Sequence, residues 1–233
     1  MISDKDRVLV VAAHPDDEVL GMGGTLLKHY RDGDEISVIF MSDGVTGRDV
    51  KYDPQKRAEE IQSRKEMALV ASTFYGSQNL SFLDLPNLRM DKEYILDVTK
   101  QIERHIAEFD PTIVYTHFGS DTNIDHGITN KACVVALRPT PDRKVASLRL
   151  FEVCSSTEYS PMMFGDDFVP NLYIDITDFS EKKLSLLECY SFEMRQSPHP
   201  RSLDSIVARD IYRGSSVGLH RAEAFIEIRR IIF

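Results

Sequence analysis

The sequence has few cysteines, no long apolar run and no excess of positive charge. Its three cysteines, Cys133, Cys154 and Cys189, are far apart, so they predict no disulfide framework and favour a reducing cytoplasm. No stretch approaches the ~20 apolar residues that span a bilayer, so we expect no transmembrane segment. The net charge of −9 argues against nucleic acid or an anionic membrane surface as the main partner.

The sequence does contain a regular alternation of apolar runs and helical patterns. Its 233 residues suffice for one domain with a full core, and no linker or repeat divides them, so we expect a single domain over residues 1–233. Short apolar runs predict strands at 7–13, 35–41, 79–82, 111–115, 149–153 and 172–176. Helices are predicted at 18–30, 54–75, 93–109, 126–137, 179–194 and 202–212. This alternation predicts an α/β fold, a Rossmann-like three-layer sandwich with a mostly parallel sheet.

Three glycines, Gly21, Gly23 and Gly24, fall inside the first predicted helix. Glycine weakens a helix, so we expect close packing on the sheet at this point. Their spacing is not the G-x-G-x-x-G of dinucleotide-binding loops, and the lysine of a phosphate-binding loop is missing. A nucleotide-binding protein is therefore only weakly indicated.

Residues 14–18 read His-Pro-Asp-Asp-Glu and directly follow the first predicted strand. Neighbouring carboxylates repel one another and resist removal from water, so such a cluster at the end of a buried strand is expensive. A bound cation is the simplest explanation. The alternative is that Asp16 and Asp17 only cap the helix that follows.

A second group of polar side chains, within residues 117–126, follows the fourth predicted strand and includes two histidines. In an open parallel sheet the carboxyl ends of the strands share one edge, so both groups should open on the same crevice. Two histidines and one carboxylate with an open position suit a catalytic zinc ion, and a further carboxylate beside them can act as general base. Ferrous iron in a non-haem site is the alternative metal.

The two groups resemble motifs of the LmbE/PIG-L family of metal-dependent de-N-acetylases. Residues 13–18 match the first motif of that family, and Asp125-His126 is similar to the end of the second. Further similarity covers nearly the whole chain, at residues 42–44, Arg64 with Glu66, 170–171, 175–177, 199–202, Gly214 and 222–225.

The resemblance implies a role for each matching residue. His14, Asp17 and His126 would be the zinc ligands, and Asp16 would be the base that activates the attacking water. Asp125 would orient an imidazole from outside the ligand set.

The resemblance also suggests residues that bind the substrate. Arg64 matches a position associated with substrate contact, and the alternative is a solvated helix arginine. The other candidates are Asp43, His117, Arg138, His199 and Arg201. For Arg138, at the end of a predicted helix, a role in complementing the helix dipole is the alternative.

The chain departs from the family pattern at Asn123. Many members carry a histidine three residues before the ligand histidine. An asparagine amide can donate a hydrogen bond to an oxyanion, but it cannot deliver a proton at neutral pH. We therefore expect Asn123 to be a catalytic hydrogen-bond donor. Either Asp16 or His117 must then protonate the leaving amine, and we favour Asp16.

The family pattern implies hydrolysis of an N-acetyl or other small N-acyl group on an amino sugar or sugar conjugate. The partner would be an N-acetylated amino sugar or glycoconjugate. The alternatives are a metal- and sugar-binding module without turnover and a non-haem iron enzyme. Family members differ in oligomeric state, so a homo-oligomer stays open.

Overall fold

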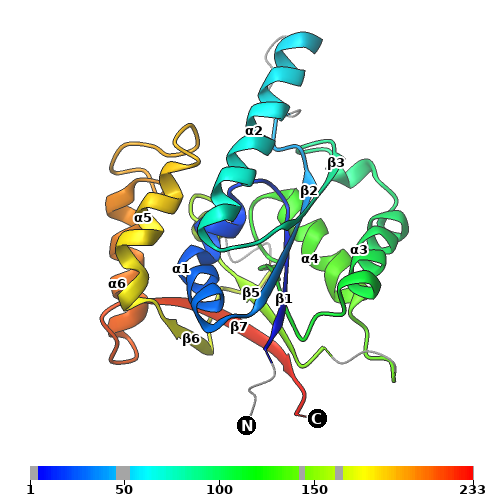
Figure 1. The fold of residues 1–233 in the computed structure, drawn as a ribbon. Coiled ribbons are helices and arrows are strands. Elements are labelled where there is room, and N and C mark those ends of the chain that lie inside the picture. Colours follow the sequence, from blue (N-terminus) through cyan, green and yellow to red (C-terminus); the bar gives the residue numbers. More distant parts are fainter. Residues whose placement is uncertain (1–4, 46–52, 142–144, 161–164, 233) are drawn as a thin grey trace.

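The computed structural model describes residues 5–45, 53–141, 145–160 and 165–232, and its core is a seven-stranded sheet (Figure 1). The strands are β1 (Arg7–Ala12), β2 (Glu35–Ser42), β3 (Asn79–Leu85), β4 (Ile113–His117), β5 (Ser147–Phe151), β6 (Leu172–Asp175) and β7 (Ala222–Arg230). The α-helices are α1 (Asp17–Asp32), α2 (Pro54–Phe74), α3 (Ile95–Phe109), α4 (Ile124–Ala136), α5 (Ser180–Glu188) and α6 (Leu203–Ser215). Short 3-10 helices are η2 (Met90–Lys92), η3 (Thr157–Tyr159) and η5 (Thr177–Phe179).

The sheet has the strand order β3-β2-β1-β4-β5-β7-β6. Strands β1 to β5 pair in parallel, and β7 is antiparallel to both β5 and β6. The chain order reverses between β1 and β4, so the carboxyl ends of these two strands flank a topological switch point. Both predicted groups of polar side chains follow these two ends.

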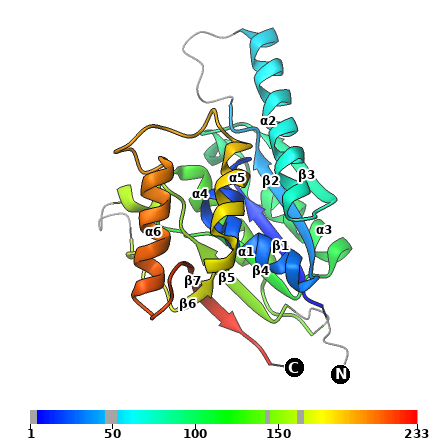
Figure 2. The same cartoon turned by 60° about the vertical axis from the view of Figure 1, so that its left-hand side comes forward.

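Alternate residues of β1 face two separate hydrophobic clusters. Val8, Val10 and Ala12 pack with residues of α1, α2, α5 and α6 on one face of the sheet. Leu9 and Val11 pack with residues of α3 and α4 on the other. Figures 1 and 2 show the same separation of the helices by the sheet. The predicted three-layer α/β fold with a mostly parallel sheet is confirmed.

Helix α2 is capped by Asp53, whose carboxylate accepts hydrogen bonds from the backbone N–H groups of Gln55 and Lys56. The helix extends past the sheet in Figure 1, and its buried residues are confined to the later turns, beginning at Arg64. That arrangement brings Arg64 to the edge where β1 and β4 end. Among the described residues, no helix is long and apolar enough to cross a bilayer.

The glycines of α1 allow the close packing that the sequence predicts. A Cβ at Gly21 would lie 2.5 Å from Cδ2 of Phe151 on β5, and a Cβ at Gly24 would lie 2.8 Å from Cγ2 of Ile176. Between them Met22 has a non-helical φ of −153°, so the helix is kinked at this point.

Several element boundaries differ from the prediction, and the largest difference concerns the helix predicted to reach Met194. Helix α5 ends at Glu188, and the chain then turns back so that Glu193 contacts Arg64. A contact between such distant segments leaves no signal in the local helical pattern, so the pattern alone does not predict where α5 ends. Strand β3 continues to Leu85, beyond the predicted end at residue 82.

Candidate metal centre and active site

A sharp turn connects β1 to α1 and presents the first group of polar side chains. His14, Pro15 and Asp16 form the turn, and Asp16 has a φ of 133°. Asp17 begins α1, and its Oδ2 accepts a hydrogen bond from the backbone N–H of His14 at 2.9 Å. A positive φ at a residue with a Cβ costs about 1–3 kcal/mol and persists where the surrounding structure fixes it, most often at functional sites.

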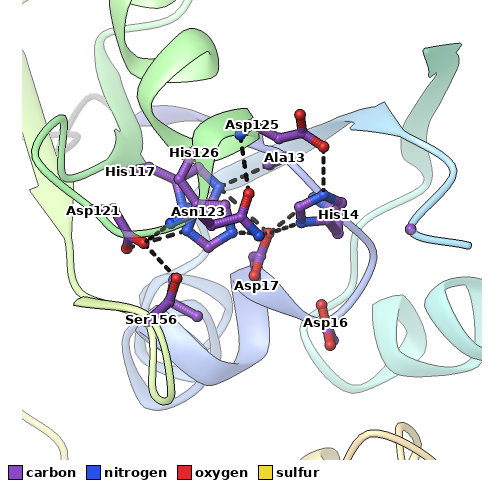
Figure 3. A network of polar contacts seen from close by, with 12 residues as sticks. Ala13, His14, Asp16, Asp17, His117, Asp121, Asn123, Asp125, His126 and Ser156 are labelled. Carbon is purple, nitrogen blue, oxygen red and sulfur yellow. Dashed lines mark hydrogen bonds and ion pairs between the residues drawn. The ribbon is translucent and has the colours of Figure 1, made fainter. Parts of the chain in front are cut away.

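His14, Asp17 and His126 come together at the carboxyl ends of β1 and β4 (Figure 3). Nδ1 of His14 lies 3.1 Å from Oδ2 of Asp17, and Nε2 of His126 lies 3.4 Å from the same oxygen. One ligand atom from each residue lies within 4.8 Å of the others, and all three residues are buried. Two loops that are distant in the sequence therefore form one cluster, as predicted.

The unpaired atoms of this cluster fit a metal ion. Oδ1 of Asp17 and both ring nitrogens of His126 are buried, and none has a hydrogen-bond partner in the described part of the chain. Buried polar atoms normally find partners, so each exception calls for an explanation. Two imidazoles and one carboxylate form the donor set of many catalytic zinc sites. The three residues can hold one divalent cation.

The ionisable groups inside the cluster shift one another's pKa values. Burial alone would raise the pKa of Asp17, but the imidazoles of His126 and His117 outweigh it and hold this pKa well below its usual range. Burial would lower the pKa of His126, but Asp17 and Asp121 raise it to about 10. A raised pKa favours the protonated ring, and a metal ion that binds His126 must displace this proton, so affinity should rise with pH.

Asp125 contacts His14 from outside the cluster. Its Oδ2 lies 3.1 Å from Nε2 of His14 and accepts a hydrogen bond from the backbone N–H of Leu88 at 2.6 Å. Its Oδ1 lies 3.4 Å from the backbone N of Met90. A carboxylate in this position can fix the orientation and tautomer of a metal-binding imidazole. The geometry agrees with the orienting role expected of Asp125.

Asp16 lies beside the cluster in a balanced group of four charges. Its Oδ2 is 3.0 Å from Nη1 of Arg201 and 3.5 Å from Nη1 of Arg64. Both arginines also contact Glu193, at 3.3 Å and 2.6 Å. Burial raises the pKa of Asp16, and the two guanidinium groups offset this only in part. A carboxylate with a raised pKa is a stronger proton acceptor, which suits a general base.

His117 packs beneath the cluster and does not reach its open side. Its Nε2 accepts a hydrogen bond from the backbone N–H of Ala13 at 2.7 Å, and its ring stacks on that of His126 with centroids 4.0 Å apart. The side chain is fully buried, and burial together with His126 holds its pKa well below the usual range. His117 is therefore neutral, and the structure does not bring it to a position where it could contact a substrate or protonate an amine.

Asn123 is the N-cap of α4. Its amide oxygen accepts a hydrogen bond from the backbone N–H of Asp125 at 2.9 Å. The residue is only partly buried, and the cap uses the oxygen of the amide but not its nitrogen. The helix cap and the predicted hydrogen bond to an oxyanion are therefore compatible.

The remaining residues predicted to bind the substrate are Asp43, His199 and Arg138. Asp43 is buried at the end of β2, and its Oδ1 accepts from the backbone N–H of Val45 at 2.7 Å. Nδ1 of His199 accepts a hydrogen bond from the backbone N–H of Arg201 at 3.0 Å, so His199 supports the loop that carries this arginine. Arg138 is exposed, follows the far end of α4 and donates to the carbonyl of Val135. This contact agrees with the alternative that Arg138 complements the dipole of its helix.

The sequence does not identify two of the acids that surround the site. Glu193 bridges Arg64 and Arg201, but it lies in a segment without a recognisable motif. Asp121 belongs to the second polar group, yet the sequence gives it no role. Its position five residues before His126 was the available signal.

Comparison with known proteins identifies the family. The family model described as GlcNAc-PI de-N-acetylase (PIG-L) matches residues 9–137, more than half of the chain. The chain is 22% identical over 192 residues to a probable N-acetyl-alpha-D-glucosaminyl L-malate deacetylase 2 of Bacillus anthracis, covering 82% of each protein. It is 25% identical over 201 residues to a 4-oxalmesaconate hydratase of Pseudomonas putida, covering 81% of this chain and 74% of the hydratase.

A solved structure shares the fold. The N,N'-diacetylchitobiose deacetylase of Pyrococcus horikoshii aligns with a TM-score of 0.78 at 19% identity, over 97% of this chain and 85% of that enzyme. The segment matched by the family model contains both polar groups and Arg64. With both groups at one edge of the sheet and the family model matching across them, the chain belongs to the PIG-L family.

Proposed function

We propose that this protein is a zinc-dependent hydrolase that removes an N-acetyl or other small N-acyl group from an amino sugar or sugar conjugate. The observation that carries the proposal is the buried cluster of His14, Asp17 and His126, with unpaired ligand atoms, directly beside Asp16. The Bacillus anthracis relative and the Pyrococcus horikoshii structure, both named as deacetylases of N-acetylated sugars, support the choice of substrate class.

His14, Asp17 and His126 would hold the zinc ion. When bound, zinc polarises an amide carbonyl and lowers the pKa of a water molecule. Zinc is proposed over ferrous iron because the additional carboxylate, Asp16, suits hydrolysis.

The three cysteines, all free in the structure, agree with the expected cytoplasmic location.

Asp16 would act as the general base. Arg201 and Arg64 fix its Oδ2 through their ion pairs with it. Asp16 would take the proton of the attacking water and return it to the leaving amine. The position of His117 supports this assignment, because its side chain is fully buried and its Nε2 already accepts the backbone N–H of Ala13.

Asn123 would donate from its amide nitrogen to the oxyanion that forms on the attacked carbonyl. The cap bond to Asp125 fixes the plane of the amide through its oxygen. Arg64, Asp43, His199 and Arg201 would border the place of the sugar, with Arg201 and Arg64 acting mainly through Asp16.

The test is a screen of N-acetylated amino sugars and sugar conjugates for release of free amine and acetate. Each compound is assayed with the zinc-loaded protein, with the protein in excess chelator and with Asp16→Asn. We expect release that requires both zinc and Asp16. Hydration of 4-oxalmesaconate without any amine release, the reaction in the name of the Pseudomonas putida relative, would contradict the proposal, and so would oxygen consumption with ferrous iron.

A further inference from the structure

The second imidazole of the metal cluster also faces a carboxylate from outside the ligand set. Oδ2 of Asp121 lies 3.1 Å from Nδ1 of His126, whereas Nε2 of the same ring faces Asp17 at 3.4 Å (Figure 3). Nδ1 of His126 and Oδ2 of Asp121 are close enough to form an ion pair, but they are not aligned as a hydrogen bond.

Asp121 is itself held in place by three neutral donors. Its Oδ1 accepts the backbone N–H of Asn123 at 2.9 Å and the hydroxyl of Ser156, and its Oδ2 accepts the hydroxyl of Thr157 at 2.8 Å. The side chain is fully buried. Ser156 and Thr157 follow β5, so the end of a third strand supports the site. A carboxylate fixed so firmly against an imidazole determines which ring nitrogen carries the proton.

We propose that Asp121 is a positioning residue that keeps the proton of His126 on Nδ1 and thereby presents the Nε2 lone pair to the metal ion. The inference rests on the proposed metal function of His126. It gives the cluster two oriented imidazoles, His14 with Asp125 and His126 with Asp121. A metal-binding histidine commonly donates its other ring N–H to a carboxylate in this way.

Asp121→Asn separates this role from a merely structural one. The asparagine oxygen can keep the bonds from Asn123 and Ser156, which turns the NH2 group toward Nδ1 of His126. An NH2 group cannot accept a proton, so the variant favours the ring form with its proton on Nε2, which cannot bind the metal there. We expect zinc affinity to fall about 10- to 100-fold, the usual effect of losing such a carboxylate.

The experiment measures zinc affinity by competition with a chromophoric chelator. Asp178→Asn is the matched control, because it removes the same charge from a side chain that is 84% exposed. Ser156→Ala keeps the carboxylate and should change affinity by less than about threefold. Thermal unfolding of the metal-free variants establishes that they are folded. Wild-type affinity in Asp121→Asn would overturn the proposal.

A second readout needs no variant. Two-bond ¹H–¹⁵N correlation spectra of the zinc-loaded wild-type protein identify the protonated and the metal-bound nitrogen of each histidine. We expect His126 to carry its proton on Nδ1 and zinc on Nε2. Zinc on Nδ1 would overturn the role of Asp121 while leaving the proposed function intact. A wild-type protein that binds no zinc at all would overturn both.

Discussion

Two buried clusters of charged side chains differ in how completely their polar atoms are paired. Against α1, Nζ of Lys183 lies 2.8 Å from both carboxylate oxygens of Asp210 and 2.9 Å from Glu223. Glu223 also accepts the backbone N–H groups of Gly24 and Thr25. In the metal cluster, by contrast, Asp17 and His126 retain buried atoms without hydrogen-bond partners in the described chain.

The difference separates a structural cluster from a binding site. The carboxylate of Glu223 accepts the backbone N–H groups just after the kink at Met22, so the paired cluster anchors the second part of α1. A buried polar atom left without a partner costs about 1–3 kcal/mol, and a bound metal ion would remove that cost at the ligand atoms of Asp17 and His126. Burial of charge alone therefore does not mark the active site, whereas a group of metal-ligand atoms without hydrogen-bond partners points to one.

The largest effect is expected beside the unpaired cluster, for Asp16→Asn. An amide keeps the shape and the contact with Arg201 but cannot take a proton, so kcat should fall about 10²- to 10⁴-fold. Zinc content should stay close to wild type, as elemental analysis would establish, although the loss of one charge from the buried group of Asp16, Glu193, Arg64 and Arg201 should lower the midpoint of thermal unfolding. Loss of zinc together with activity would show that Asp16 supports the metal site and is not the base.

Removing the cation from the paired cluster of Lys183, Asp210 and Glu223 should lower the free energy of unfolding. Lys183→Met leaves Asp210 and Glu223 buried without their cation, so the free energy of unfolding should fall by about 3–5 kcal/mol. Urea denaturation measures it, with Lys28→Met as the matched control. The exposed pair of Lys28 with Asp32 should contribute less than about 1 kcal/mol. Equal effects of the two substitutions would contradict the structural role of the buried cluster.

The buried carboxyl group of Glu18 should make the free energy of unfolding depend on pH. This effect should be smaller than that of Lys183→Met. Burial raises its pKa from 4.5 to about 8, although Tyr190 donates to its carboxyl group at 2.7 Å. Between these values the folded chain keeps a proton that the unfolded chain has lost, so stability falls as pH rises through this window and levels off above it.

Glu18→Gln removes this titration. In the metal-free wild-type protein the free energy of unfolding should fall as the pH rises from about 5 to about 8. In the metal-free variant the fall should be smaller by on the order of 1–3 kcal/mol. Urea denaturation in excess chelator at both pH values measures the difference. The same pH dependence in both proteins would contradict the assignment.

Arg138→Ala should have the smallest effect. Helix α4 rises about 1.5 Å per residue, which places Arg138 roughly 18 Å along the chain direction from His126. The variant should therefore keep the KM and kcat of wild type within about twofold in a steady-state amine-release assay. A large rise in KM would mean that the end of α4 contributes to substrate binding after all.

Local patterns and one topological rule predict the main features of the fold and the site. The apolar run before His14 predicts β1, and parallel pairing predicts that the loops after β1 and β4 share an edge. These two inferences suffice to bring His14 and His126 together. The glycines of α1 likewise predict close packing, which Gly21 makes against Phe151.

The remaining features depend on contacts between segments that local patterns do not connect. Glu193 reaches Arg64 only because the chain leaves α5 early, and Asp121 is anchored by Ser156 from the loop after β5. Neither contact leaves a periodic or motif-like signal. The burial of His117 follows from its place as the last residue of a central strand, where the backbone of Ala13 supplies its partner.

The central claim is that residues from two distant loops share one divalent ion, and the zinc stoichiometry of His126→Ala tests it most directly. Wild-type protein reconstituted with zinc and desalted should retain about one ion per chain by elemental analysis, and the variant should retain almost none while remaining folded. Unchanged stoichiometry in the folded variant would contradict the account.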